Sequence, residues 1–446
     1  MTGSLLFAAV ADDDTGASDL AGMLAEQGVR ALLVLDAALL QEGHGLLQQA
    51  QAIVLATATR ALPRHEAFAV TAEAVRRAAA LGPRTIEIKY CSTFDSTVEG
   101  NIGPTLDAAL DASGERFTIA VPALPVNGRT TYCGYHFVKG QLLSDSPMRL
   151  HPLTPMTNPN LVDHLQLQTA RRVSLTPSDV VARGASAIRR QWAELSKTGV
   201  AIAVVDCIGD AQAAEIGEAA CDLKLISGSS LFGTHLPPAW RRRGWLPQPP
   251  EHLWEGLLPG AGTGKLVVAG SCSVATASQN AWLAHQGAEV IELDARELIE
   301  TGGTGIAPRA AAMLESGGTV LLKTRSSQDA ISAAQQWGSS HGWSTAELGL
   351  RLAAALAAVT RQILDRQLPE VLVCAGGETT GAICRALGIR AFAVDRNIQP
   401  GVPLCLPLER QCVPMALKSG NFGSEGFYGA AFAAAERFRK AGSAAR

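Results

Sequence analysis

The chain has 446 residues, with 38 Lys and Arg against 41 Asp and Glu, which gives a formal net charge of -3. This balance provides no broad electrostatic reason to expect nucleic acid or an anionic membrane as the partner. A hydrophobic content of 47% with 18% charged residues is typical of globular proteins and excludes extended disorder, and the apolar runs are far too short for a membrane span.

Short apolar runs alternate along the chain with alanine-rich helical patterns. The first run has no basic segment before it and ends at Asp12, Asp13 and Asp14, so it indicates a buried strand rather than a signal peptide. Repeated alternation predicts an α/β fold with mainly parallel sheets flanked by helices. The expected strands are residues 5–10, 31–35, 52–56, 85–90, 117–121, 201–205, 265–269, 290–293, 319–323 and 371–375, and the expected helices are residues 18–27, 65–81, 177–195, 276–286 and 345–366.

The segment 236–259 differs from the rest of the chain in carrying six prolines and three tryptophans. Proline removes backbone donors and resists regular structure, so we expect the domain junction here. The prediction is a first domain at 1–238, a Pro-rich linker at 239–261 and a second domain at 262–446. Because two such domains can enclose two substrates, we expect the active site in the cleft between them.

The nine cysteines are scattered, odd in number and free of any CxxC pair, which predicts reduced thiols and a cytoplasmic location. The nine histidines show no paired-ligand spacing, so a dedicated zinc site is not expected. Pattern alone does not separate an apolar dimer face from core, so a homodimer stays open.

The first polar cluster, Asp12, Asp13 and Asp14 followed by Thr15, stands where the first strand should end and a helix begin. Ligands of open parallel sheets bind outside the carboxyl ends of the strands. Three adjacent carboxylates repel one another, and helix capping with Thr15 or Ser18 as N-cap accounts for only one or two of them. The cluster therefore favours a site for a polar substrate or magnesium, with capping alone as the alternative.

The second cluster, residues 89–97, again follows an expected strand and contains Lys89, Asp95 and four aliphatic hydroxyls, among them Ser96. The lysine can pair with a carboxylate, while Asp95 and the hydroxyl groups can bind sugar hydroxyls. This composition suits a small polyhydroxy acid, and a capped turn is the alternative.

Two further loops are ambiguous on residue type alone. Asn127 precedes a glycine in a turn signal, and Arg129 on that turn could clamp an anion or be a solvated surface arginine. His151 lies in a proline-punctuated loop at 149–156 and is equally compatible with a structural or a functional role.

Three glycine-rich loops follow expected strand ends in the second half, at 270–273, 376–381 and 418–426. Glycines at a strand–helix turn let backbone N–H groups approach phosphate oxygens. Three such loops in one domain indicate a nucleotide site. The string at 262–265 resembles part of a Walker A loop but precedes its strand, and no dinucleotide fingerprint follows the first strand, so both motifs are rejected.

At these clusters the chain resembles the four-carbon acid sugar kinase family nearly from end to end. The family's Ala-Asp-Asp-Phe-Thr-Gly-like motif appears at 11–16, with Asp14 in place of an aromatic residue, and its Asp-Ser-Thr…Gly-Asn turn appears at 95–101. The strings at 89–97, Glu99, 101–104 and 151–156 look like the 3-oxo-tetronate kinase branch. The strings at 270–273, 376–379 and 418–423 match the family's nucleotide-binding motifs.

The resemblance implies an acid-sugar-binding domain, an ATP-binding domain, and transfer of the ATP γ-phosphoryl group to the 4-hydroxyl of a 3-oxo-tetronate, with Mg²⁺ bridging the phosphates. Lys89 or Arg129 would then hold the substrate carboxylate. One of Asp95, Asp12 and Asp13 would orient or deprotonate the hydroxyl. The implied substrate contacts are Thr15, Gly16, Lys89, Ser96, Asn127 and Arg129. The implied ATP contacts are Ser271, Ser273, Gly376, Gly377, Glu378, Thr379 and Gly420.

Three alternatives remain open at this point. A kinase of the same fold could act on D-threonate or D-erythronate, although Glu99 and the 89–95 string count against it. A non-catalytic nucleotide-gated binding protein would keep the glycine loops but would have no need of the acidic cluster. A dehydrogenase is disfavoured by the absent dinucleotide fingerprint.

Overall fold

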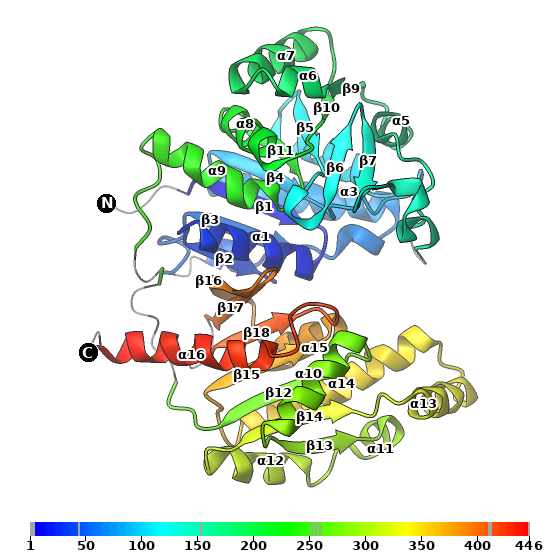
Figure 1. The fold of residues 1–446 in the computed structure, drawn as a ribbon, viewed down its shortest axis with the longest axis vertical. Coiled ribbons are helices and arrows are strands. Elements are labelled where there is room, and N and C mark those ends of the chain that lie inside the picture. The colour runs from blue at the N-terminus through cyan, green and yellow to red at the C-terminus, as the bar shows by residue number, and fades with distance from the viewer. Residues whose placement is uncertain are drawn as a thin grey trace. The chain divides into compact units, whose positions relative to one another are not determined.

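The computed structural model describes residues 5–42, 45–151, 154–250, 253–254, 257, 260–408 and 413–444. The chain forms two compact units, Met1–Leu253 and Trp254–Arg446 (Figure 1). None of the helices in the described part of the chain has the length and hydropathy needed to span a membrane. The cysteines of the same residues are all free thiols, and Cys412 lies outside them.

The first unit is built on a parallel sheet. Its strands are largely apolar and mostly buried along their whole length, as expected when helices cover both faces. In sheet order they are β2 (Ala31–Val34), β3 (Ala52–Ala56), β1 (Phe7–Ala11), β4 (Thr85–Lys89), β11 (Leu225–Gly228), β5 (Thr118–Val121), β10 (Ile202–Val205) and β9 (Val173–Thr176).

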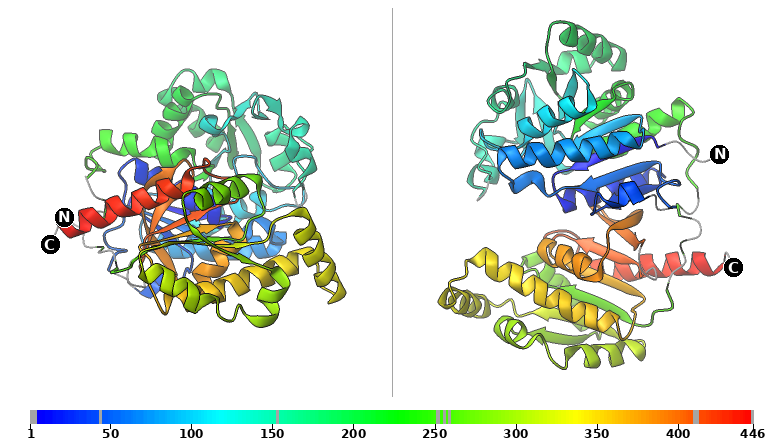
Figure 2. Two further views of the ribbon diagram at one scale, coloured as in Figure 1. Left: turned by 60° about the horizontal axis from the view of Figure 1, so that its bottom comes forward. Right: turned by 180° about the vertical axis from the view of Figure 1, so that it is seen from behind.

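Helices cover the two faces of this sheet in separate groups. Helices α1 and α9 lie on one face of the sheet (Figure 1). On this face the ring of Phe7 in β1 packs 5.9 Å from that of Trp240 in α9. Helices α3 and α4 pack together on the opposite face, seen from behind in Figure 2. The helices of the unit are α1 (Asp14–Glu26), α2 (Leu39–Glu42), α3 (Arg64–Ala80), α4 (Ile102–Ser113), α5 (Leu161–Gln166), α6 (Ser178–Val181), α7 (Ala185–Lys197), α8 (Asp210–Ala220) and α9 (Leu231–Arg242).

A small antiparallel sheet, β6 (Arg129–Tyr132), β7 (Tyr135–Val138) and β8 (Gln141–Leu142), lies between β5 and β9 in the sequence. Its first turn is fixed by the buried carboxylate of Asp206, which accepts hydrogen bonds from the backbone N–H groups of Cys133 and Gly134 at 2.7 and 2.9 Å. The same carboxylate accepts one from Ser178 at 2.9 Å. Asp206 therefore joins the small sheet to the first residue of α6 (Ser178–Val181).

The second unit has a mixed sheet in which β17 runs antiparallel to both of its neighbours. In sheet order the strands are β13 (Glu289–Leu293), β14 (Thr319–Thr324), β12 (Lys265–Ala269), β15 (Val371–Ala375), β18 (Met415–Lys418), β17 (Val402–Pro407) and β16 (Ala391–Gln399). Helices α10 and α16 pack together on one side, and α14 and α15 on the other (Figures 1 and 2). The helices are α10 (Val274–His285), α11 (Ala295–Thr301), α12 (Ile306–Glu315), α13 (Gln328–Ser340), α14 (Thr345–Leu364), α15 (Gly377–Leu387) and α16 (Phe427–Ala444).

The predicted α/β architecture with mainly parallel sheets is confirmed, and each expected strand is present with ends that differ by at most two residues. The expectation of one helix at 177–195 is wrong. Gly184 has a φ of +85°, a conformation that side chains with a Cβ rarely adopt, and it separates α6 from α7.

The boundary between the two compact units falls inside the expected linker, at 253/254. The first four residues of the expected linker, 239–242, are not a linker in the structure. They form the last turn of α9, and Ala239 and Trp240 are fully buried. Tertiary packing thus outweighs the two prolines in the helix. Residues 251–252, 255–256 and 258–259 of the linker lie outside the described residues.

Candidate active site

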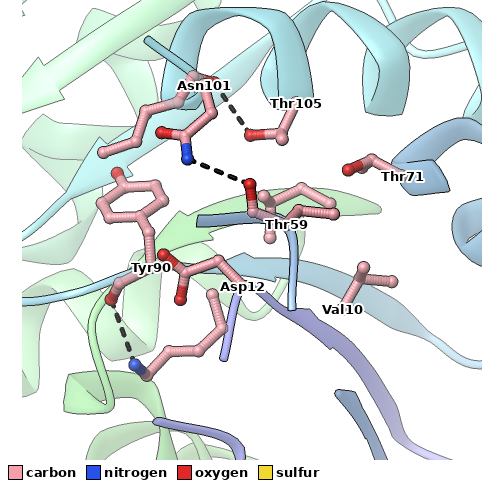
Figure 3. A pocket seen from close by; sticks show the side chains of 10 residues that line it. Val10, Asp12, Thr59, Thr71, Tyr90, Asn101 and Thr105 are labelled. Carbon is pink, nitrogen blue, oxygen red and sulfur yellow. Dashed lines mark hydrogen bonds between the residues drawn. The ribbon is translucent and has the colours of Figure 1, made fainter. Parts of the chain in front are cut away.

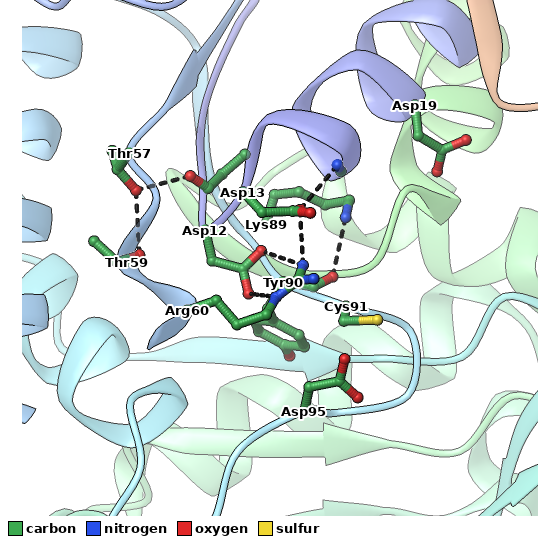
Figure 4. Close-up of polar contacts among 12 residues, drawn as sticks. Asp12, Asp13, Asp19, Thr57, Thr59, Arg60, Lys89, Tyr90, Cys91 and Asp95 are labelled. Carbon is green, nitrogen blue, oxygen red and sulfur yellow. Dashed lines mark hydrogen bonds and ion pairs between the residues drawn. The ribbon is translucent and has the colours of Figure 1, made fainter. Parts of the chain in front are cut away.

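Polar side chains gather where three neighbouring strands of the first unit end. Asp12 and Asp13 follow β1, Arg60 lies in the short 3-10 helix after β3, and Lys89 ends β4. The sheet order β3–β1–β4 brings these ends side by side, as expected at the carboxyl edge of a parallel sheet. The structure therefore joins the first and second predicted clusters into one site (Figure 4).

Arg60, which the sequence analysis missed, is the cation that holds the aspartate pair. Its Nε donates to Asp12 Oδ2 at 2.9 Å, and its Nη2 donates to Asp12 Oδ1 at 2.8 Å and Asp13 Oδ1 at 2.7 Å (Figure 4). Burial lowers the pKa of Arg60, but the carboxylates of Asp12 and Asp13 raise it by more, so the guanidinium stays charged. Burial raises the pKa of Asp12, and Arg60 opposes that shift.

Asp13 is the N-cap of α1, in place of the Thr15 or Ser18 expected from the sequence. Its Oδ1 accepts a hydrogen bond from the Gly16 backbone N–H at 2.9 Å. A Cβ on Gly16 would lie 2.5 Å from that oxygen and 3.0 Å from the Nζ of Lys89, so glycine lets these groups approach the helix start. Lys89 is itself only 3% exposed, and its Nζ donates to the Tyr90 carbonyl at 3.0 Å.

Asp95 is positioned by a strained but well-packed turn. Phe94, just before it, is a non-glycine residue with a φ of +54°, a conformation that costs about 1–3 kcal/mol. Its buried ring packs edge-on against the rings of Tyr90 and His164, at 5.5 and 6.1 Å between centroids. Asp95 accepts a hydrogen bond from Thr93 Oγ1 at 2.5 Å. The packed ring therefore fixes the direction of the Asp95 carboxylate.

Two buried amides connect the loops of the site. Asn101 Nδ2 donates to the carbonyl of Thr59 at 3.1 Å and to that of Arg60, which ties the two loops together. Gln168 is fully buried, and its Oε1 accepts from Ser96 Oγ and from the backbone of Gly103, at 3.1 and 2.8 Å. The hydroxyl of Ser96, a predicted substrate contact, thus donates its hydrogen bond to the side chain of Gln168.

Two cavities of different size adjoin the cluster. The smaller, about 10 Å³, lies behind Asp12 and is lined by Thr59, Thr71 and Thr105 among others (Figure 3). It is about the space of one water molecule, and the buried Thr71 hydroxyl has no partner among the described residues. The larger, about 640 Å³, lies beside Arg60 and is lined by residues 60–64, 96–97, 99–101, His151 and Thr154.

The third predicted loop lies at the small sheet. Arg129 Nη1 donates to the Asn127 carbonyl at 2.6 Å, and its Nε is buried without a partner among the described residues. Burial lowers the pKa of His136 to about 4, and the charges of Arg129 and Asp95 shift it in opposite directions. Both charges therefore lie near one imidazole. In the fourth loop, Nδ1 of His151 accepts from the backbone of Thr154 at 3.1 Å, and Pro152 and Leu153 lie outside the described residues.

In the second unit, the predicted glycine loops meet at the ends of β12, β15 and β18, which are neighbours in the sheet. Gly376 has a φ of +125°, which favours glycine, and precedes α15 without a side-chain cap. A Cβ on Gly270 would lie 2.2 Å from Thr379 Oγ1, and one on Gly420 would lie 2.3 Å from Ser271 Oγ. The glycines are thus required for the loops to pack together, and the first N–H groups of α15 have no acceptor within the helix.

The Gly420 loop is held by buried polar groups. Its carbonyl accepts from Ser273 Oγ at 2.6 Å, Thr276 Oγ1 at 2.9 Å and Lys418 Nζ at 3.1 Å. Burial lowers the pKa of Lys418 to about 8. Gln279, which the sequence analysis missed, is fully buried, and its amide nitrogen lies 3.0 Å from three carbonyls of 422–424.

The acidic cluster does not have the donor set of a resident metal site. No group of three or more His, Cys, Asp or Glu side chains in the described part of the chain could hold a metal ion. Asp12 and Asp13 already bind the guanidinium of Arg60. The two carboxylates are therefore neutralised by a side chain of their own unit.

Comparison with known proteins matches both units. A sugar-binding N-terminal domain model matches residues 7–236, and a nucleotide-binding C-terminal domain model matches residues 266–428. Proteins from Cupriavidus necator and Pseudomonas fluorescens, each named 3-oxo-tetronate kinase, are both 40% identical to this chain, and each match covers 95% of either chain. Two solved structures are each 32% identical to this chain and each match covers 96% of it. The structure from Salmonella typhimurium has a TM-score of 0.83 and is covered over 98% of its length. The structure from Haemophilus influenzae has a TM-score of 0.78 and is covered over 99% of its length. The chain belongs to the four-carbon acid sugar kinase family.

Proposed function

We propose that this protein transfers the γ-phosphoryl group of ATP to the terminal 4-hydroxyl of a 3-oxo-tetronate. The observation that carries the proposal is that relatives named 3-oxo-tetronate kinase match the chain over nearly its full length, at 34–40% identity. The two polar sites have the complementary chemistry that such a reaction needs: carboxylates and cations in the first unit, and glycine loops in the second. A cytoplasmic location is part of the proposal.

Phosphoryl transfer depends on positioning and charge stabilisation more than on covalent chemistry. The predicted ATP contacts fit these needs. The uncapped start of α15, at Gly377, offers backbone N–H groups to phosphate oxygens, and Ser271, Ser273 and Gly420 form the adjoining wall. Mg²⁺ would supply charge neutralisation on the phosphates. Lys418 donates to the Gly420 carbonyl and so keeps that loop in place.

The substrate hydroxyl needs a carboxylate that orients it or takes its proton. Asp13 already caps α1 and binds Arg60, and both oxygens of Asp12 bind Arg60. Asp95 accepts one hydrogen bond, from Thr93, among the described residues. We therefore place the hydroxyl at Asp95, with Arg60 neutralising the aspartate pair nearby. Thr15, Gly16, Ser96, Asn127 and the cations Lys89 and Arg129 remain predicted substrate contacts.

Identification of the product tests this proposal directly. The protein is incubated with ATP, Mg²⁺ and 3-oxo-tetronate, and the product is examined by ³¹P and ¹³C NMR. We expect a phosphomonoester whose phosphorus couples to C4 and its hydrogens. A phosphate on another carbon would contradict the assignment of the acceptor, and an unchanged acid with no phosphoester would contradict the kinase itself.

A further inference from the structure

The larger cavity of the first unit, here called the Arg64 pocket, is lined by residues 60–64, 96–97, 99–101, 151 and 154. Its volume of about 640 Å³ is ample for a four-carbon acid, whereas the cavity behind Asp12 has room for about one water molecule. The Arg64 pocket is therefore the hollow beside the acidic cluster in which the whole substrate can fit.

Two opposite charges face this pocket without being paired. Arg64 Nη2 donates to the backbone carbonyl of Gln168, and no carboxylate among the described residues lies within 4.0 Å of the Arg64 guanidinium. Glu99, across the β4–α4 loop, is exposed and makes no hydrogen bond or ion pair with the described residues. Charges of opposite sign that line one pocket yet do not meet suit a ligand with an acidic end and a hydroxyl-bearing end.

The chemistry of the two side chains assigns these ends. A guanidinium binds a carboxylate through two parallel N–H groups, and a glutamate can only accept hydrogen bonds, which sugar hydroxyls donate. Arg64 is also the first residue of α3, whose N-cap, Pro63, supplies no side-chain cap. The partial positive charge of the helix start therefore adds to the preference for an anion beside Arg64.

The pocket is connected to the acidic cluster of Asp12 and Asp13 by Arg60. Arg60 lines the pocket while its Nε and Nη2 bind Asp12 and Asp13. Asn101, another pocket residue, donates to the carbonyls of Thr59 and Arg60, so the wall of the pocket and the acidic cluster are fixed to each other.

We propose that Arg64 binds the carboxylate of the four-carbon acid and that Glu99 accepts hydrogen bonds from its hydroxyl groups, which makes these two residues specificity determinants. The inference rests on the proposed function for the identity of the acid. It departs from the sequence expectation that Lys89 or Arg129 holds the carboxylate, because Lys89 is nearly fully buried and neither residue lines the Arg64 pocket.

Binding measured by calorimetry without ATP tests the pocket apart from catalysis. Three ligands are compared: 3-oxo-tetronate, the neutral ketotetrose that lacks the carboxylate, and 3-oxobutanoate, which lacks the hydroxyls. The variants are Arg64→Gln, Arg64→Lys and Glu99→Gln. Arg76→Gln is the matched control, because Arg76 lies on the same helix, is 58% exposed and pairs with Glu73. Melting followed by circular dichroism verifies that each variant is folded.

We expect Arg64→Gln to raise the Kd for 3-oxo-tetronate about tenfold to a hundredfold and to leave ketotetrose binding within about twofold, since only the acid loses a charge-assisted contact. Arg64→Lys should recover part of the loss. Glu99→Gln should raise the Kd for 3-oxo-tetronate about fivefold and the Kd for 3-oxobutanoate less than about twofold. In turnover, Arg64→Gln should raise KM with kcat nearly unchanged, because the carboxylate is bound equally in the ground and transition states.

The outcomes separate this inference from the proposed function. If the wild type phosphorylates 3-oxo-tetronate but Arg64→Gln and Glu99→Gln bind it as the wild type does, the pocket assignment is overturned and the kinase stands. Loss of acid binding in Lys89→Met but not in Arg64→Gln would also overturn it. If the wild type binds the acid in an Arg64-dependent manner without turnover, the assignment holds and the proposed function fails.

Discussion

Replacing Glu87 by Gln perturbs a buried carboxyl group in β4, the strand that carries Lys89. Glu87 is fully buried, and neither of its carboxylate oxygens has a hydrogen-bond partner among the described residues. Burial raises its pKa to about 8, and the charge of Lys89 opposes part of that shift. The side chain is therefore protonated at neutral pH in the folded protein and ionised in the unfolded chain.

The sign of the effect follows from proton linkage. Between the ordinary value of 4.5 and about 8, the folded state binds a proton that the unfolded state has lost, so stability falls as pH rises through this window. At about 1.4 kcal/mol per pH unit, the interval corresponds to at most roughly 5 kcal/mol. A glutamine is neutral throughout, so Glu87→Gln should lose this contribution to the pH dependence.

Urea denaturation followed by far-UV circular dichroism at pH 5.5, 7 and 8.5 measures the effect as the difference between wild type and variant, in which other titrating groups cancel. We expect the free energy of unfolding of the wild type to fall by about 2–4 kcal/mol relative to Glu87→Gln across this range. Glu194→Gln, at a 67% exposed position, is the control and should parallel the wild type. If the free energies of unfolding of the wild type and of Glu87→Gln changed with pH in parallel, the reasoning would be refuted.

Three further changes follow from the contacts described above. Asp95→Asn should lower kcat about 10²- to 10⁴-fold and leave the Kd for ATP unchanged, and near-normal turnover would remove Asp95 from the mechanism. Lys418→Met removes the ammonium from the Gly420 carbonyl and should raise the Kd for ATP about tenfold by calorimetry, with acid binding as the internal control. Asp206→Asn should cost about 2–4 kcal/mol in urea denaturation, because three backbone N–H groups lose a carboxylate. Asp179→Asn, 76% exposed, is its control, and equal stability of the two variants would contradict the anchoring role of Asp206.

The sequence was sufficient for strands that are buried on both faces. The runs that became β3 and β12 are uniformly apolar or nearly so, and they are bounded by polar residues at β3 and by glycines at β12, so even their ends were predicted correctly. β16 was missed because its second half, 395–399, is largely polar and its pairing with β17 is irregular. The single helix expected at 177–195 was wrong because Gly184 was not recognised as a break.

The residues of the candidate site that lie together in the sequence could be predicted. Those that meet only through contacts between distant parts of the chain could not. The acidic pair after β1 and the glycine loops of the second unit are contiguous motifs at strand ends, and they were found. Arg60 is separated from Asp12 by 48 residues, and Gln168 from Ser96 by 72, so only the folded sheet shows that they meet. The hydrophilic turn after β3 carried no pattern that distinguished Arg60 from a solvated arginine.

The central claim is tested most directly by ADP release with ATP and Mg²⁺, coupled to NADH oxidation, in a comparison of 3-oxo-tetronates with D-threonate and D-erythronate. The account predicts turnover with the keto acids and a kcat/KM at least about a hundredfold higher than with either non-oxidised acid, a difference of about 2.7 kcal/mol in transition-state binding. Preference for D-threonate or D-erythronate would contradict the substrate assignment. Absence of ADP release with every acid, from protein that binds ATP, would contradict the kinase itself.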